Sequence, residues 1–335
     1  MTPALKLSVL DQSPIAEGSS GAQALHNTID LARLSEALGY HRYWVSEHHG
    51  TGMLAGPSPE VLISGIASAT STIRVGSGGV MLPHYSPLKV AETFSVLSGL
   101  YGDRIDLGIG RAPGTDPQTS FALQRDRRYQ AIDDFPEQLA ELIAYLQASF
   151  PEGHPLARLA GTLPGLPFGP RLWLLGSSPQ SAIWAGELGL PYSFADFINP
   201  AGAEIAALYR ERFVPSAELA EPQLAIAVST ICAETDEHAE RLAASARMAF
   251  VLLRRGRPAA IPPVETAVEF LSQIVPSELA MHPRRLVVGT PERVRAGLKA
   301  AAAEYGASEV AAVTIVHDHA ARRRSYELIA SAFGL

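Results

Sequence analysis

The chain has 335 residues, 47% of them hydrophobic and 18% charged, which is enough apolar content for one large domain or two ordinary ones. A formal net charge of -7 and the lack of a dominating basic tract argue against nucleic-acid binding, and Arg322, Arg323 and Arg324 fit a solvated helix face. Cys232 is the only cysteine, so an intrachain disulfide framework and a cysteine-based zinc site are excluded.

Eight short runs of β-type sequence alternate with helical patterns along the chain. In the first unit a run at 6–10 ends in a polar turn, and apolar residues at helical spacing then follow over 26–38 until Gly39 ends the helix. The expected strands are 6–10, 43–46, 74–82, 105–110, 172–176, 192–195, 224–231 and 310–316. The helices that follow them are expected at 26–38, 59–68, from Ser86-Pro87, 135–146, from Ser178-Pro179, 200–213, 236–253 and 322–333.

This regular alternation predicts an α/β protein, a closed (β/α)8 TIM barrel, rather than an open sheet with two domains. Several strands are nearly continuous apolar runs, as is typical of strands covered on both faces. We expect one domain over 1–335 with two insertions. The Pro- and Gly-rich stretch 150–171 has no periodicity, and 254–289 lengthens the seventh crossover, as a lid, a packing surface or a solvated tether.

No basic region followed by a long apolar stretch opens the chain, and no later apolar run is long enough to span a membrane. We therefore expect a cytoplasmic protein without membrane or nucleic-acid partners.

A carboxylate and two imidazoles, Glu47, His48 and His49, follow the strand at 43–46. The carboxyl ends of barrel strands carry the chemistry of this fold. Adjacent histidines on a strand point to opposite faces, which disfavours a shared metal ion. The pattern favours one catalytic and one structural imidazole, with two surface histidines as the alternative.

Two segments could hold an anion. Arg111 follows Gly110 at a strand end, where its guanidinium offers a bidentate fork to a phosphate and the glycine permits close approach. Gly176, Ser177 and Ser178 lead into a helix whose first N–H groups are free to bind a phosphate. The alternatives are a structural arginine paired with an acid and an ordinary helix cap.

Ser77, Gly78 and Gly79 follow the third strand. The missing Cβ atoms make room for a flat ligand against the backbone, or permit a bulge.

Four segments together resemble the bacterial-luciferase-like (LLM class) flavin-dependent monooxygenases. They read WVSEHH at 44–49, VGSGGVMLP at 75–83, GLYGDRIDLGIGR at 99–111 and VVGTPE at 287–292. The resemblance spans nearly the whole chain in the same order, and the set is specific where any single piece would not be.

The resemblance implies a luciferase-like barrel that holds FMN at the strand carboxyl ends. Arg111 matches the phosphate-binding arginine of the family, and Ser178 and Ser181 match positions that bind the same phosphate. Gly78 and Gly79 match a cis peptide that supports the flavin ring. His48 matches an imidazole near the flavin and the substrate.

The sequence also departs from the luciferases. Gly110 stands where they carry a cysteine beside the flavin, so light emission and aldehyde chemistry are not implied. Arg125, Arg127 and Arg128 are alternatives for a second phosphate contact.

These observations favour a two-component monooxygenase in which reduced FMN arrives as a co-substrate from a separate flavin reductase and a small organic substrate is oxygenated with O2. No G-x-G-x-x-G segment follows a strand, which favours an external source of reduced flavin. His48 would handle protons, and Glu47 would orient an imidazole or hold the structure. A homodimer is the family expectation.

Three alternatives remain at this point. A barrel of the same fold could use the deazaflavin F420 for hydride transfer. A flavin-binding protein without turnover would also fit, and a metal-dependent hydrolase is the third alternative.

Overall fold

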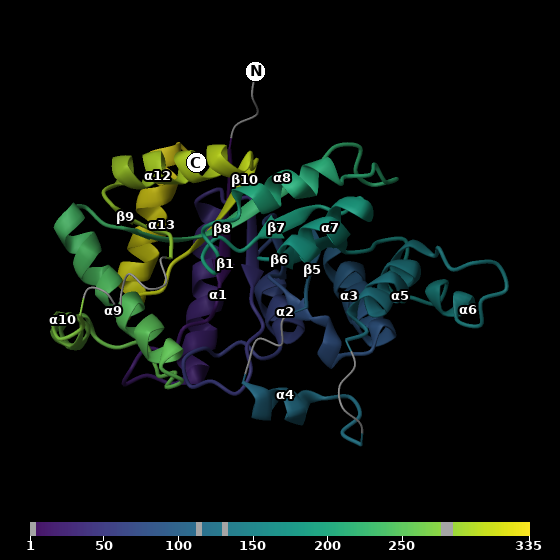
Figure 1. The fold of residues 1–335 in the computed structure, drawn as a ribbon, viewed down its shortest axis with the longest axis horizontal. Helices are drawn as coiled ribbons and strands as arrows, with labels where there is room; N and C mark the ends of the chain where they lie inside the picture. Colours follow the sequence, from purple (N-terminus) through teal and green to yellow (C-terminus); the bar gives the residue numbers. More distant parts are fainter. Residues whose placement is uncertain (1–4, 112–115, 129–132, 276–283) are drawn as a thin grey trace.

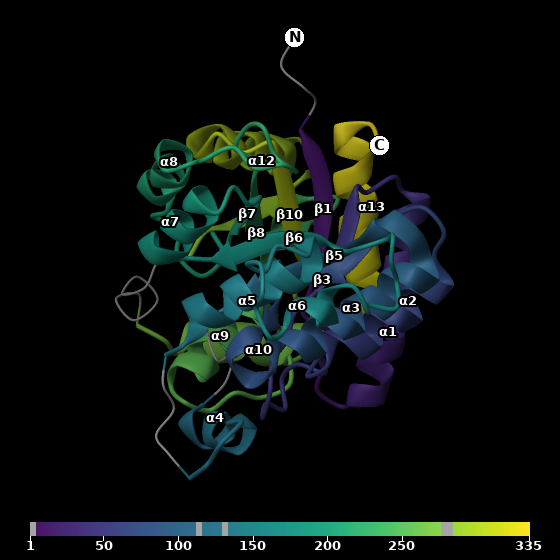
Figure 2. The ribbon, with the colours of Figure 1, turned by 90° about the vertical axis from the view of Figure 1, so that its right-hand side faces the viewer.

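Eight parallel strands form a closed barrel in the computed structural model, which describes residues 5–111, 116–128, 133–275 and 284–335 (Figures 1 and 2). Each strand pairs with the next, and β10 pairs with both β1 and β8, which closes the circle. The expected (β/α)8 barrel is thereby confirmed. Its strands are β1 (Lys6–Asp11), β2 (Arg42–Val45), β3 (Arg74–Ser77), β5 (Ile105–Gly110), β6 (Arg171–Gly176), β7 (Tyr192–Phe194), β8 (Leu224–Cys232) and β10 (Glu309–Val313).

Helices surround the barrel on its outside, as the ribbon views show (Figures 1 and 2). The helix after Thr235 begins where the sequence predicts it, whereas the helices expected from 26 and from 322 begin earlier, at Gly21 and His319. The side chains of Ser20, Thr235 and Asp318 each accept a hydrogen bond from a backbone N–H of the first turn. The main helices are α1 (Gly21–Ala37), α2 (Pro59–Ala69), α3 (Pro87–Tyr101), α5 (Phe135–Gln147), α7 (Pro179–Glu187), α8 (Ala203–Glu211), α9 (Asp236–Arg254), α12 (Pro291–Tyr305) and α13 (His319–Phe333). No described helix is long and apolar enough to cross a membrane.

The structure adds short elements that the sequence did not reveal. The strand expected over 74–82 is split in two: β3 ends at Ser77, and β4 (Val80–Met81) pairs separately with β5. The peptide bond between Gly78 and Gly79 is cis. The seventh crossover contains α10 (Val264–Ser272) and β9 (Leu286–Gly289), and β9 extends the sheet beside β8. The remaining short pieces are α4 (Pro117–Leu123), α6 (Ala157–Ala160) and the 3-10 turns η1 (Leu82–His84) and η2 (Gly102–Arg104).

The barrel separates two apolar cores because successive side chains of a strand point to opposite faces. On β1, Leu7 and Val9 belong to the large core between the barrel and its helices, whereas Leu10 belongs to a smaller core. This inner core consists of Leu10, Trp44, Trp173, Ala225, Ala227, Ala311 and Val313.

A buried ionic network fills the inside of the barrel at the amino ends of its strands. The guanidinium of Arg42 donates to Asp106 at 2.5 Å and to Glu309 at 2.6 Å, and all three side chains are buried. The same guanidinium lies 5.3 Å and 4.7 Å from the ring centres of Trp44 and Trp173. Because this end is filled, the space inside the barrel lies toward the carboxyl ends.

Candidate functional site

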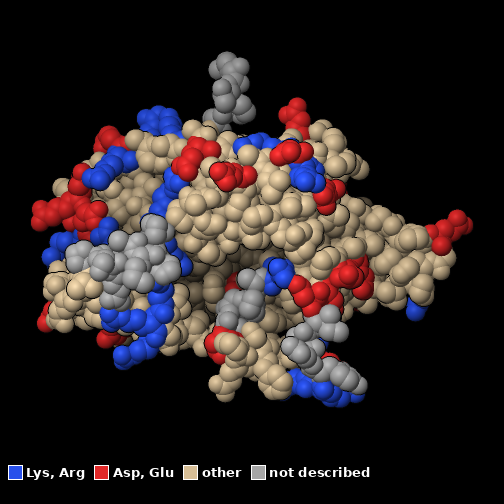
Figure 3. All heavy atoms as spheres, in the orientation of Figure 1, with Lys and Arg blue, Asp and Glu red and all other residues tan. Residues whose placement is uncertain are grey.

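A cavity of about 470 Å³ lies at the carboxyl ends of the barrel strands. The face drawn in Figure 3 is hollowed near its centre, between the barrel and α4. Every barrel strand, or the residue that follows it, contributes to the wall. The lining residues that the sequence predicted are His48, Gly78, Gly79, Gly110, Arg111, Gly176, Ser177, Ser178 and Ser181. Residues far apart in the chain therefore meet in one cavity.

The imidazole of His48 lies in the cavity wall, and its Nδ1 is 3.1 Å from the hydroxyl oxygen of Ser46. Its backbone N–H donates to the carbonyl of Gly56 at 3.0 Å, which anchors the loop after β2. Burial, with the neighbouring His49, lowers the pKa of His48 to about 4. The imidazole is therefore neutral at physiological pH.

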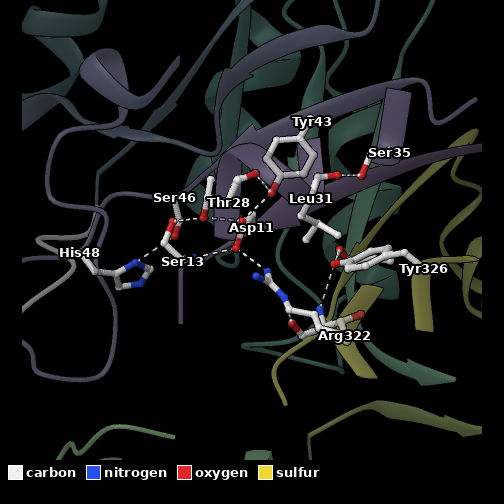
Figure 4. A network of polar contacts seen from close by, with 12 residues as sticks. Asp11, Ser13, Thr28, Leu31, Ser35, Tyr43, Ser46, His48, Arg322 and Tyr326 are labelled. Carbon is white, nitrogen blue, oxygen red and sulfur yellow. Dashed lines mark hydrogen bonds and ion pairs between the residues drawn. The ribbon is translucent and has the colours of Figure 1, made fainter. Parts of the chain in front are cut away.

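Below this loop, the buried carboxylate of Asp11 gathers several donors (Figure 4). It accepts hydrogen bonds from the hydroxyls of Thr28 and Tyr43 and from the guanidinium of Arg322. Burial alone would raise the pKa of Asp11, but Arg322 and these hydrogen bonds hold it below its ordinary value. The carbonyl of Asp11 accepts the N–H of Ser46, so the network supports the residue that contacts His48.

The burial of Arg322 corrects the expectation of a solvated face for the whole run 322–324. Only 3% of its side chain is exposed, whereas 51% of the side chain of Arg324 is exposed. The first arginine of the run faces the barrel because α13 packs against it, a contact that a charge count does not reveal.

Glu47 does not line the cavity. Its buried carboxylate accepts from His49 Nε2 at 2.6 Å, from the hydroxyl of Tyr85 at 2.9 Å and from the N–H of Met81 at 2.9 Å. Burial and this carboxylate raise the pKa of Tyr85. The geometry fits both roles expected for Glu47, because its carboxylate orients the imidazole of His49 and also holds the backbone at Met81.

Ser77 also lies outside the cavity wall. Its hydroxyl donates to the carbonyl of Gly108 at 2.9 Å and accepts the N–H of Gly108 at 3.0 Å. The side chain thereby joins β3 to β5 where the backbone pairing of the two strands stops.

Glycines form one side of the cavity, and at two of them the neighbouring residues leave no room for a Cβ atom. A Cβ at Gly79 would lie 2.7 Å from the carbonyl oxygen of Gly108, and one at Gly176 would lie 2.2 Å from the hydroxyl of Ser181. A flat ligand can approach the backbone closely here.

The cavity end beside β5 and β6 carries donors for an anion. Arg111 follows β5, and Ser178 caps α7, where its hydroxyl accepts the N–H of Ser181 at 3.4 Å. The guanidinium of Arg111 pairs with Asp133, so in this structure the predicted alternative of an acid partner is present as well. Both side chains are about half exposed, at 49% and 57%.

The three arginines considered for a second phosphate contact do not line the cavity. Arg125 pairs with Asp134 and Arg128 with Asp126, while Arg127 donates to the carbonyl of Ala122. Residues 112–115 and 129–132 on either side lie outside the described part of the chain.

Several lining residues were not among our predicted site residues. Gln12 and Ser46 stand at strand ends, so their positions could have suggested them, but Trp184 and Phe135 lie on outer helices and gave no local signal. Trp184 lies against Arg111, with the guanidinium 5.8 Å from the ring centre. Within the described residues, no group of three or more His, Cys, Asp or Glu side chains could hold a metal ion.

Comparison with known proteins reveals similarity over the full length. A family model described as luciferase-like monooxygenase matches residues 5–309. The luciferase-like monooxygenase of Escherichia coli (strain K12) is 42% identical over 97% of this chain and 96% of its own. The N-acetyl-S-alkylcysteine monooxygenase of Bacillus subtilis (strain 168) is 38% identical over 98% of both chains.

Solved structures agree with these matches. The crystal structure of apo-MsnO8 superposes with a TM-score of 0.91 and 44% identity, covering 99% of this chain and 98% of the other. The oxygenating constituent of 3,6-diketocamphane monooxygenase from Pseudomonas putida, in complex with FMN, has a TM-score of 0.72 over 98% and 97% of the two chains. At 22% identity, the latter likeness concerns the fold alone.

Proposed function

This chain belongs to the luciferase-like monooxygenase family, a family of flavin-dependent enzymes that incorporate oxygen, and from that membership we propose that it is the FMN-dependent oxygenating component of a two-component system. A separate flavin reductase would supply reduced FMN, and the enzyme would use O2 to oxygenate a small organic substrate. The observation that carries this proposal is that His48, Gly79, Arg111 and Ser178 all line one cavity.

The residues present fit FMN on both of its parts. The glycine side can accept a flat ring, because Gly79 and Gly176 line the cavity without a side chain that would cover their backbone. Arg111 and the start of α7 offer a guanidinium and N–H groups to the phosphate. A solved structure of the same fold carries FMN, which supports this choice of cofactor.

When bound, reduced FMN would supply the reaction with O2. The chain would hold the flavin and the substrate in place, exclude water from the cavity and provide a side chain that handles a proton. His48 carries the last of these roles. Burial lowers its pKa to about 4, which keeps the imidazole neutral, so one nitrogen can contact the hydroxyl of Ser46 while the other is free to accept a hydrogen bond or, within the reaction step, a proton.

Replacement of Arg111 by alanine tests the phosphate site. We expect FMN binding to weaken by about 1.5–3 kcal/mol, because a charge-assisted hydrogen bond is lost. This corresponds to a dissociation constant about 10- to 150-fold higher in a fluorescence titration.

Arg125→Ala serves as the matched control, since Arg125 does not line the cavity, and its FMN affinity should match that of the wild type. An unchanged affinity in Arg111→Ala would remove Arg111 from the site.

Asp133→Asn should have the opposite effect. In the absence of a ligand, Asp133 is the anion paired with Arg111, and a phosphate would have to displace it. Because exposed ion pairs are worth about 0–1 kcal/mol, we expect FMN to bind up to about fivefold more tightly. The difference in FMN affinity between this variant and the wild type should shrink at high salt. A weaker FMN affinity in the variant would contradict competition between Asp133 and the phosphate for Arg111.

Two alternatives can be separated by simple measurements. The absorbance spectrum of the bound chromophore distinguishes FMN from F420. Rapid mixing of the reduced, flavin-loaded protein with O2 distinguishes a monooxygenase, which stabilises an oxygenated flavin, from a flavin-binding protein without turnover. We also expect a cytoplasmic homodimer, and light scattering would reveal the oligomeric state.

A further inference from the structure

The two sides of the cavity differ in chemistry. Gly79, Gly110 and Gly176, together with Arg111, lie at or just after the ends of the neighbouring strands β3, β5 and β6 and form the side assigned above to FMN. The opposite side comes from β8, β10, β1 and β2, which are also consecutive around the barrel. Its inward residues, here named the alanine side, are Leu10, Trp44, Ala227 and Ala311.

Two small residues create the space on this side. Ala227 of β8 and Ala311 of β10 are direct partners in the strand register, so their side chains lie next to each other inside the barrel. Bulky branched residues usually fill such positions in barrels of this fold. Two alanines in register therefore leave a hollow where other barrels have packed side chains.

The hollow has a rigid floor. Trp44 packs edge-to-face against Trp173, with the ring centres 5.2 Å apart, and both rings are held over the buried guanidinium of Arg42. A ligand in the hollow cannot move these two tryptophan rings without disturbing the ion pairs of Arg42 beneath them.

The described residues of the alanine side include no charged side chain that could pair with a charged ligand. Arg111 is the only charged side chain among the described lining residues, and it lies on the other side of the cavity. Burying a charged group without a partner is costly, whereas an apolar group gains about 25 cal/mol for each Å² removed from water. Gln12, Ser46 and His48 nearby offer hydrogen bonds only.

We propose that the alanine side binds the reacting part of the substrate, that this part is an uncharged apolar group, and that Ala227 and Ala311 limit its size. This inference rests on the proposed function, which places the cofactor on the glycine side.

A matched pair of probes tests the charge preference. Methyl phenyl sulfide is neutral and apolar, and its para-carboxylate has the same shape with one negative charge. We expect the neutral sulfide to bind FMN-loaded protein about tenfold or more tightly than the carboxylate, because the latter would bury an unpaired charge. Calorimetry and the change in FMN absorbance would measure both affinities.

Substitutions of Ala311 test whether the neutral sulfide binds at the alanine side. Ala311→Leu should fill the hollow and weaken binding of the neutral sulfide about tenfold or more, because an overpacked site must rearrange to admit the probe. FMN affinity should stay unchanged, since Ala311 lies on the opposite side from the phosphate donors. Ala311→Val adds less volume and serves if Ala311→Leu does not fold. Ala311→Gly should bind butyl phenyl sulfide, the butyl analogue of the neutral probe, more tightly than the wild type does.

The same titrations in FMN-free protein separate this inference from the proposed function, with tryptophan fluorescence as the readout because Trp44 and Trp184 line the cavity. Failure of wild-type protein to bind FMN would overturn the proposed function, while preference for the neutral sulfide would still support the alanine side. Equal affinity for the two probes, or unchanged sulfide binding in a folded Ala311→Leu or Ala311→Val variant, would overturn the inference.

Discussion

Replacement of His48 by alanine is expected to lower turnover by about 10²–10⁴-fold, the usual loss when a positioned acid or base is removed. The imidazole lines the cavity and is oriented by the hydroxyl of Ser46, whereas the phosphate donors lie at the far end. FMN affinity should therefore change little. The measurement is the rate of sulfoxide formation from methyl phenyl sulfide with chemically reduced FMN and O2.

His238→Ala is the control, because this histidine lies on the surface with 53% of its side chain exposed. Ser46→Ala should lower the rate less than loss of the imidazole, since it removes only the orienting hydrogen bond. Turnover in His48→Ala equal to that of the control would exclude a catalytic role for His48.

The pH dependence provides a second test of His48. Burial lowers its pKa from the ordinary value of 6.5 to about 4, so the unfolded chain binds a proton at a higher pH than the folded protein does. As pH falls from 6.5 toward 4, this group therefore favours unfolding. In His48→Ala the free energy of unfolding should fall less over this interval than in the wild type, and equal slopes would contradict the low pKa.

The second large effect is expected for Arg322→Met. This substitution leaves the carboxylate of Asp11 buried without its cationic partner. Breaking a buried pair by removing one partner typically costs about 3–5 kcal/mol, so we expect the free energy of unfolding in urea to fall by about that amount. Because the pKa of Asp11 is lowered in the folded protein, its contribution is present at neutral pH and is lost as pH falls through the acid range.

Arg324→Met is the matched control from the same helix. Its guanidinium pairs with Glu234, and both side chains are about half exposed. Water screens such exposed pairs, so the stability of this variant should stay close to that of the wild type. Equal losses for the two variants would show that the Asp11 network does not support the fold as the geometry indicates.

The fold was predictable because its signals are local. Apolar runs, capping residues such as Ser178 and the prolines that follow them indicate strands and helices without knowledge of the partner strands. All eight barrel strands occur where the sequence predicts them. The short elements β4, β9, α6 and α10 were missed because elements of this length depend on tertiary packing more than on propensity.

The site was predictable only in part, because some of its residues are indicated by their own position in the sequence and others only by contacts with distant residues. The glycines at strand ends and Arg111 are visible in the sequence because their residue types suit a ligand at those positions, although a bulge and an acid-paired arginine were open alternatives. The chain did not reveal that Glu47 turns away from the cavity, that Ser77 joins two strands or that Trp184 reaches the site from an outer helix.

The sequence by itself determined the order of strands and helices and the identity of the residues at the strand ends, since these follow from neighbours along the chain, and the regular alternation predicted the barrel that the pairing of β1 with β10 closes. Only the tertiary structure decided which charges are buried in pairs, as for Arg322 and Asp11, and which small residues meet to open a space, as for Ala227 and Ala311. Burial and pairing join residues that are distant in sequence, and a free-energy term that depends on two such residues cannot be read from either one alone.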